Sequence, residues 1–304
     1  MIPEQVDPRS AVLPAFCRIT KCRTRIRKWK ARASDKRKGQ PVRLSFSIFG
    51  GICANRTPQG RTSFCFGCVY GKMAGDDLPT ERNCIFMKLE KMDEFFAARI
   101  DGYDEHMRSN IEGASGFYAY TAELLPREVK SRILDLGCGT GLELEAYFAK
   151  NPFAEVTGID LSEVMLNALK AKFPDNKLNL IQDSYFSVPF GEEQYDGAVS
   201  VESLHHFRAD MKASLYRKLH AALKDGGLFV LTDYFAESEE LEKEYFQNLA
   251  ALKKEQGLSD DEFYHYDTPL LVEHEMDILR QAGFRDVRIM QKWGESTHTV
   301  LAAK

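Results

Sequence analysis

The sequence has no run of about 18 consecutive apolar residues, the length that a helix needs to span a membrane. The apolar stretch 44–54 follows basic residues, as in a signal peptide, but the basic part is too long and the apolar part too interrupted for one. Beyond residue 86 there is a single cysteine, Cys138. These absences favour a cytoplasmic protein with reduced thiols and no membrane partner.

The charge of the chain is divided unevenly. Residues 1–86 hold 17 Lys and Arg against 6 Asp and Glu, a net charge of +11, whereas residues 87–304 hold 24 against 39, a net charge of −15. Six of the seven cysteines also lie in the first segment. The change in composition predicts a basic, cysteine-containing extension over 1–86 and the main domain over 87–304.

Three interpretations of the extension compete. Its cations, gathered between residues 18 and 38 around Trp29, suit a nucleic acid or another anionic surface. The C-x-x-C pair Cys65 and Cys68 suggests a metal module, but no second pair has comparable spacing and the segment has no histidine. We favour the third interpretation: a largely irregular segment that is disordered or not native, with Met87 as the natural start.

Regular patterning begins after residue 87. Apolar residues at helical spacing predict a helical lid over 87–125, which ends before Pro126. Strand and helix patterns then alternate, an order typical of a parallel sheet covered on both faces. The predicted strands are 132–136, 155–160, 178–182, 195–201 and 227–233, and the predicted helices between them include 141–150, 163–172 and 209–223.

The last third of the chain departs from simple alternation. A helical insertion is predicted over 237–282, and it is followed by two strand patterns joined by a short turn. We therefore expect an α/β fold with a doubly wound, seven-stranded, mostly parallel sheet that ends in an antiparallel hairpin.

The first predicted strand leads into a glycine-rich loop. Gly137, Gly139 and Gly141 allow positive φ angles and leave backbone N–H groups open to a ligand, and a helix N-terminus follows. A dinucleotide fingerprint needs its third glycine at position 142, where the chain has Leu142. The spacing therefore argues against a nicotinamide oxidoreductase, although that alternative stays open.

With Asp135 in front, the loop reads D-x-G-x-G-x-G and resembles motif I of the class I S-adenosylmethionine-dependent methyltransferases. The resemblance covers about 89–304 and is strongest with small bacterial enzymes that carry a helical lid before the sheet. It implies a Rossmann-like methyltransferase fold, S-adenosyl-L-methionine as cofactor, and metal-free, in-line methyl transfer to a small-molecule acceptor. Around the loop it implies cofactor contacts from Asp135, Gly137, Cys138, Gly139, Gly141 and Leu161.

Polar residues at the ends of later strands complete the predicted cofactor site. Asp160 can accept hydrogen bonds from both ribose hydroxyls, while Ser162 is better placed to cap the next helix. Asp183 can accept from the adenine amino group and Ser184 can donate to a ring nitrogen. In the related enzymes the fourth strand end, here with Ser200, lines the methionyl tail, and the lid, here with Tyr103, closes over the cofactor.

A general base is needed only if the acceptor carries a proton that must leave. The predicted catalytic candidates are His205, Glu202 and Tyr234. His205 and His206 are adjacent, which suggests a metal site, but neighbouring residues on a helix point in different directions and no third ligand is apparent. We therefore predict no metal.

Three functional alternatives remain beside methyl transfer to a small molecule. A tRNA-modifying relative shares the helix after the fifth strand, but the acidic main domain argues against nucleic acid as its partner. A nicotinamide oxidoreductase and a non-catalytic adenosyl-binding protein are the other two. The identity of the acceptor and the oligomeric state cannot be read from the sequence.

Overall fold

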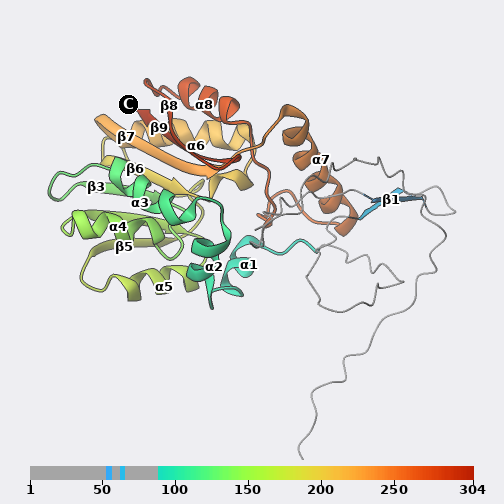
Figure 1. The fold of residues 1–304 in the computed structure, drawn as a ribbon, viewed down its shortest axis with the longest axis horizontal. Coiled ribbons are helices and arrows are strands. Elements are labelled where there is room, and N and C mark those ends of the chain that lie inside the picture. The colour runs from blue at the N-terminus through green and yellow to red at the C-terminus, as the bar shows by residue number, and fades with distance from the viewer. Residues whose placement is uncertain (1–52, 57–61, 66–87) are drawn as a thin grey trace, which may run out of the picture. The chain divides into compact units, whose positions relative to one another are not determined.

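The computed structural model describes residues 53–56, 62–65 and 88–304 (Figure 1). The chain divides into two units, Met1–Met87 and Lys88–Lys304. In the first unit, β1 (Cys53–Arg56) and β2 (Thr62–Cys65) form an antiparallel pair that the sequence did not predict. The predictions of an anion-binding stretch over residues 18–38, of a metal module and of a largely irregular segment concern residues that lie mostly outside the described ones.

The second unit is built on a seven-stranded sheet in the order β5-β4-β3-β6-β7-β9-β8. The first five strands in this order are parallel, and β9 runs antiparallel to both of its neighbours, β7 and β8. The predicted α/β fold with a terminal hairpin is thus confirmed. The strands are β3 (Arg132–Leu136), β4 (Glu155–Asp160), β5 (Lys177–Gln182), β6 (Tyr195–Val201), β7 (Leu223–Tyr234), β8 (Arg288–Trp293) and β9 (Thr297–Ala303).

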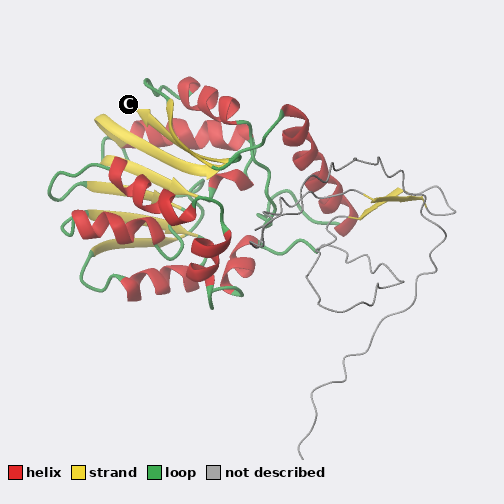
Figure 2. Cartoon of the chain, viewed as in Figure 1, coloured by secondary structure: helices red, strands yellow, loops and turns green. Residues whose placement is uncertain are grey.

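Helices cover both faces of this sheet (Figure 2). Side chains that are adjacent in a strand point to opposite faces, so Ile133 packs in one apolar core and Leu134 in the other. One core contains residues of α3 (Ala114–Leu124), α4 (Leu142–Lys150) and α5 (Glu163–Lys172). The other contains residues of α6 (Ala209–Ala222) and α8 (Val272–Gln281).

A buried ionic contact joins the two helices of the second core. Lys212 Nζ lies 2.5 Å from Glu275 Oε2, and the side chains are 2% and 0% exposed. The hydroxyl of Tyr216 donates to the other oxygen of Glu275. The carboxylate is therefore fully partnered, as a buried charge requires.

The predicted helical lid contains three short helices, α1 (Met92–Ala97), α2 (Tyr103–Asn110) and α3. Gly102 and Gly113, with φ angles of 78° and 81°, precede α2 and α3 and separate them from the helix before. The predicted insertion contains α7 (Glu239–Gln256), an irregular segment 257–271, and α8. In the described residues, no helix combines the length and apolar character needed to cross a membrane.

The beginning of the lid is tied to the irregular segment 257–271. The N–H of Met92 donates to the carbonyl of Phe263 at 3.0 Å, and the N–H of His265 donates to the carbonyl of Glu90 at 3.0 Å. The ring of His265 also stacks on Phe95, with 3.5 Å between centroids. We call this pairing of residues 89–92 with 263–265 the strap, and it holds α1 in place.

Candidate active site

The glycine loop after β3 is a left-handed turn with little spare room on one side. The φ angles of Gly137, Gly139 and Gly141 are 75°, 46° and 72°. A β-carbon at Gly137 would lie 2.1 Å from the Ser203 hydroxyl oxygen, whereas one at Gly139 would meet nothing within 4 Å. Gly139 therefore borders open space, and only a residue without a side chain leaves its backbone accessible from there.

That open space is a cavity of about 620 Å³, part of it open to solvent. Its wall comes from residues that follow the carboxyl ends of β3, β4, β5 and β6, together with α1 and the first residue of α2. Ligands of open α/β sheets bind at this edge. Seven of the residues predicted from the sequence line the cavity: Tyr103, Gly137, Gly139, Asp160, Leu161, Ser184 and Glu202.

Asp160 is held by the backbone around it. One carboxylate oxygen accepts the N–H of Gly139 at 2.9 Å, and the other accepts the N–H of Ser162 at 2.8 Å. Each oxygen keeps a second lone pair for a ligand. Ser162 caps α5 through its hydroxyl, as the sequence predicted. Burial raises the pKa of Asp160 above its ordinary value, so the site favours a hydrogen-bond donor beside this carboxyl.

Beneath the loop lie two buried carboxyl groups, Asp135 and Glu143. Burial, and next the negative charge of Glu143, raises the pKa of Asp135 well above its usual range; burial raises the pKa of Glu143 to about 7. Asp135 Oδ2 and Glu143 Oε1 are buried without a hydrogen-bond partner. Neither residue lines the cavity, so this carboxyl pair lies beneath the glycine loop and not in the cavity wall.

The other predicted cofactor residues do not line the cavity. Cys138 is buried, and the hydroxyl of Ser200 donates to the carbonyl of Leu136 at 2.9 Å, so both lie within the core beside the loop. Gly141 begins α4. Asp183 is exposed, and one of its oxygens accepts the N–H of Ser184 at 2.6 Å.

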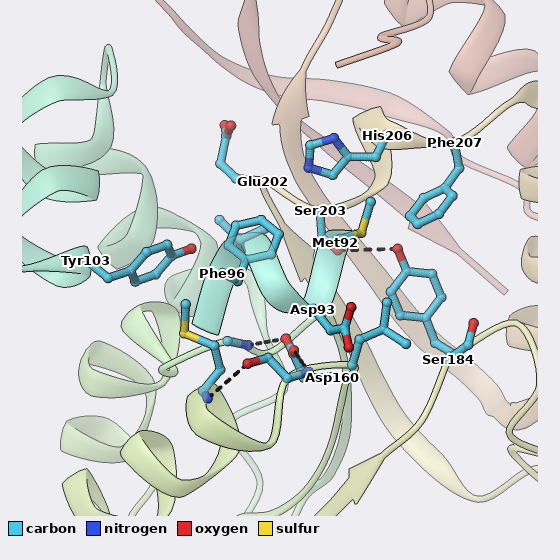
Figure 3. A pocket seen from close by; sticks show the side chains of 17 residues that line it. Met92, Asp93, Phe96, Tyr103, Asp160, Ser184, Glu202, Ser203, His206 and Phe207 are labelled. Carbon is cyan, nitrogen blue, oxygen red and sulfur yellow. Dashed lines mark hydrogen bonds between the residues drawn. The ribbon is translucent and has the colours of Figure 1, made fainter. Parts of the chain in front are cut away.

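The end of the cavity away from Asp160 combines aromatic side chains with Glu202 and His206. Figure 3 shows Asp160 toward one end, Glu202 and His206 toward the other, and Phe96 of α1 among them. None of the residues that line the cavity is a lysine or arginine. The other lining residues were not predicted as site residues: Met92, Asp93, Phe96, Ser162, Met165, Tyr185, Val201, Ser203, His206 and Phe207.

His205 lies behind this wall, between two carboxylates. Its Nδ1 is 2.6 Å from Asp233 Oδ1 and its Nε2 is 3.5 Å from Asp267 Oδ1. Burial alone would lower the pKa of His205, but the negative charges of Asp233 and Asp267 outweigh it and raise this pKa well above its usual value. The imidazole is therefore protonated at neutral pH.

Unlike His205, Glu202 and Tyr234 have pKa values shifted in favour of their neutral forms. Burial, and next the charge of Asp233, raises the pKa of Glu202 to about 8. Glu202 has a φ angle of 49°, and its Oε1 has no hydrogen-bond partner. Burial raises the pKa of Tyr234, whose hydroxyl lies 3.1 Å from that of Tyr245. Tyr234 does not line the cavity.

His206 differs from its neighbour in both position and charge. It lines the cavity, and burial, followed by the positive charge of His205, lowers the pKa of His206. Its Nδ1 lies 3.2 Å from the carbonyl oxygen of Tyr266 and 3.3 Å from Asp267 Oδ1. The sequence showed this residue only as one of a pair, because side-chain directions in a short turn cannot be read from spacing.

The prediction that the two adjacent histidines point in different directions, with no third ligand nearby, is wrong for this turn. His205 and His206 belong to the 3-10 helix η1 (Leu204–His206), their ring centroids are 4.0 Å apart, and both face Asp267. A metal could be held by these three, or by Glu202, His205 and Asp233. However, Nδ1 of His205 already contacts Asp233, and Nδ1 of His206 already contacts the carbonyl of Tyr266. The absence of a metal therefore stays our prediction.

Comparison with known proteins shows that the chain is similar to methyltransferases and to a related synthase. Residues 133–227 match a family described as a methyltransferase domain. A carboxy-S-adenosyl-L-methionine synthase of Nitratiruptor sp. is 25% identical over 225 residues, which cover 70% of this chain and 94% of that protein. A 24-methylenesterol C-methyltransferase 2 of Oryza sativa is 30% identical over 135 residues, which cover 43% of this chain and only 36% of that protein.

Two solved structures share the fold. A putative O-methyltransferase from Nostoc punctiforme has a TM-score of 0.53 and 19% identity, covering 72% of this chain and 63% of that one. The cyclopropane synthase MmaA2 of Mycobacterium tuberculosis has a TM-score of 0.50 and 14% identity, covering 63% of this chain and 84% of that one. At these identities the likeness concerns the arrangement of strands and helices.

Proposed function

Because the chain belongs to the class I S-adenosylmethionine-dependent methyltransferases, we propose that its cavity binds S-adenosyl-L-methionine and a small-molecule acceptor together, and transfers the methyl group between them. The observation that carries the proposal is one continuous cavity, with Asp160 toward one end and the aromatic wall toward the other; Gly139, hydrogen-bonded to Asp160, also lines it.

The residues of the first end suit the cofactor. Asp160 keeps lone pairs for the ribose hydroxyls, and Gly139 leaves room beside the loop. Asp135, which is buried beneath the loop and does not line the cavity, stays a predicted cofactor residue only. Ser184 lines the cavity where an adenine ring would follow the ribose. When bound, S-adenosyl-L-methionine supplies a methyl group on a sulfonium leaving group.

The protein's own contribution is then orientation and the exclusion of water. Apolar side chains of α1 and Phe207 cover the acceptor end, and the strap fixes α1 there. Holding the two reactants in line provides most of the rate enhancement that such a transfer needs from its enzyme. No step in this scheme calls for a metal.

Calorimetry with S-adenosyl-L-methionine tests the cofactor site. We expect Asp160→Ala to weaken binding by about 1.5–3 kcal/mol, the scale for losing charge-assisted hydrogen bonds. Thermal melting of Asp160→Ala serves as the control for loop damage, because both oxygens of Asp160 also accept backbone N–H groups. NADH is the competing ligand, and binding of NADH in preference to S-adenosyl-L-methionine would support the oxidoreductase alternative instead.

Product analysis separates catalysis from mere binding. Mass spectrometry should detect S-adenosylhomocysteine and a methylated acceptor, whereas a non-catalytic adenosyl-binding protein would give neither. A screen that includes unmodified tRNA addresses the tRNA-modifying alternative. We expect no transfer to tRNA, because residues 87–304 carry a net charge of −15. A cytoplasmic location remains part of the proposal.

A second function deserves a test because one relative named a carboxy-S-adenosyl-L-methionine synthase is matched over 94% of its length. In that case the adenosyl product would carry an added carboxyl group. A donor of such a group is an anion, yet among the described residues no lysine or arginine lines the cavity to bind it. We therefore expect S-adenosylhomocysteine, and an adenosyl product heavier by a carboxyl group would overturn this choice.

A further inference from the structure

We propose that His206 is the general base of the transfer and that the acceptor is an uncharged aromatic molecule with a weakly acidic hydroxyl group. The proposal rests on the proposed function and deepens it. Its starting point is that the imidazole of His206 faces the cavity at the end opposite Asp160, among aromatic side chains (Figure 3).

The hydrogen-bond partner of His206 Nδ1 fixes which ring nitrogen is basic. The carbonyl oxygen of Tyr266, 3.2 Å away, can only accept a hydrogen bond, so Nδ1 must carry the proton. Asp267 Oδ1, 3.3 Å from the same nitrogen, favours the same tautomer. Nε2 is then left with its lone pair, and no described residue donates a hydrogen bond to it. A base oriented through its second nitrogen is the arrangement that proton abstraction requires.

The neighbouring ionisable groups are less suited to this role. His205 is held between Asp233 and Asp267 and keeps its proton. Glu202 is largely protonated at neutral pH and can donate a hydrogen bond to the acceptor but not take its proton. Tyr234 lies outside the cavity wall.

The charge of His206 depends on groups from every element packed against it. The imidazolium of His205 and the enclosing protein lower its pKa, and Asp267 opposes them. His265, whose ring centroid is 5.0 Å away, also has a pKa lowered by burial, to about 4, and so stays neutral. From α1, the ring of Phe96 packs at 6.4 Å and Asp93 lines the cavity. The net result is a neutral imidazole at physiological pH.

The walls define the acceptor. Met92, Phe96 and Phe207 offer apolar and aromatic surface, which suits a flat ring. Because no lysine or arginine of the described residues lines the cavity, a carboxylate or phosphate on the acceptor would lose its hydration without gaining a partner among them. A free amine attacks without a base, so a histidine placed in this way is most useful to a hydroxyl.

The bonds and charges of the step balance as follows. The O–H bond of the acceptor breaks and its proton moves to Nε2 of His206, while the oxygen lone pair forms a bond to the methyl carbon. The S–CH₃ bond breaks, and its electron pair stays on sulfur, which becomes a neutral thioether. The positive charge thus passes from sulfonium to the imidazolium of His206, which returns its proton to solvent.

The test uses the full chain and a series of para-substituted phenols, with benzylamine and benzoate as probes of other chemistry. We expect S-adenosylhomocysteine to form with the phenols and not with benzoate or benzylamine. His206→Gln should lower kcat about 10²–10³-fold for weakly acidic phenols, the scale of general base catalysis. The loss should shrink for 4-nitrophenol, which is already largely ionised at slightly alkaline pH.

A matched variant and a binding measurement keep the outcomes distinct. His220→Gln alters a histidine that packs on Phe284 of the α6–α8 side, and it should leave kcat unchanged. Calorimetry should show the same affinity of wild type and His206→Gln for S-adenosyl-L-methionine. An equal loss for all phenols would remove His206 as the base, and turnover of amines or benzoates, or of no phenol at all, would overturn the acceptor class. Failure to bind S-adenosyl-L-methionine would instead refute the proposed function.

Discussion

At the scale of single residues, Gly139 separates the demands of folding from those of ligand binding. A β-carbon there meets no protein atom within 4 Å, so a substitution costs the protein mainly the strain of its φ angle of 46°. That strain amounts to about 1–2 kcal/mol for a residue other than glycine. The space that the new carbon would occupy is the space proposed for the cofactor.

We therefore expect Gly139→Ala to lower the affinity for S-adenosyl-L-methionine more than tenfold while the melting temperature falls only slightly. Gly226→Ala is the control, because Gly226 has a φ angle of 77° and equally open surroundings but lies away from the cavity. Calorimetry and thermal melting of both variants would decide. Equal affinities in the two variants would mean that the glycine loop serves the fold alone.

His205 predicts a pH dependence of stability. Its pKa is raised in the folded protein by Asp233, whose side chain is 2% exposed, and by Asp267. A group with a raised folded pKa contributes stability that is fully present below its unfolded pKa, about 6.5, and that is lost as the pH rises through the folded value. Wild type should thus lose this contribution only in the alkaline range.

The variant His205→Gln lacks that contribution and leaves Asp233 without its cation. We expect it to unfold about 3–5 kcal/mol more easily than wild type at slightly acidic pH, and the gap to narrow as the pH becomes alkaline. Denaturant titrations across the pH range measure the gap. A difference that stays constant with pH would show that His205 is neutral in the folded protein.

Residue roles were predictable where they follow the chain and not where they depend on side-chain direction. The glycine spacing and the acid at the end of β4 pointed to Gly139 and Asp160, and both line the cavity. His206 could not be distinguished from His205, because the turn of η1 decides which ring faces the cavity. Phe96 was visible as part of a lid helix, but its place in the cavity wall depends on the strap.

At the scale of elements, α6 and α8 are joined by the buried contact between Lys212, Tyr216 and Glu275. Both Glu273 and Glu275 lie in the first turn of α8, where a negative charge interacts favourably with the helix dipole. Glu275 is completely buried and contacts Lys212 and Tyr216, whereas Glu273 is exposed. Breaking a buried pair strands the remaining charge in the core.

Glu275→Ala should therefore cost about 3–5 kcal/mol of unfolding free energy, and Glu273→Ala less than about 1 kcal/mol. Urea denaturation of the two variants provides the comparison. Binding of S-adenosyl-L-methionine should be unchanged in both, because neither residue lines the cavity. A Glu275→Ala protein as stable as the control would show that the ion pair contributes no net stability.

Strand positions were predicted closely because the apolar runs and their glycine or polar borders are local signals. β7 is the main exception: it begins at Leu223 and not at 227. The stretch after Leu223 contains Gly226 and reads as a turn, yet Leu223 pairs with Tyr195 across an irregularity in the register. Pairing with a distant strand overrides a local turn signal here, and spacing alone does not reveal that.

At the scale of the whole molecule, the described part of the second unit contains the complete sheet and the complete cavity wall. All seven strands of that sheet and all lining residues lie within Lys88–Lys304. A chain that begins at Met87 should therefore keep the melting temperature and cofactor affinity of the full chain.

The full chain should differ in its retention on heparin, because residues 1–86 add a charge of +11, and salt should abolish the difference. Differential scanning calorimetry, cofactor titration and heparin chromatography of the two forms test this. Aggregation of the shorter form, or loss of its cofactor binding, would show that the basic segment belongs to the fold.

The strap has a consequence for the order in which the protein matures. Lys91 and Glu262, which form an ion pair beside it, are 171 positions apart, and β9 enters the sheet between β7 and β8 only after both have been synthesised. Contacts so distant in the chain form late in folding. On the ribosome, the glycine loop and the early strands emerge long before the segment that holds α1 over them. The segment that holds α1 in place is thus available only after residue 265 has been synthesised, so the protein can enclose two reactants only late in translation.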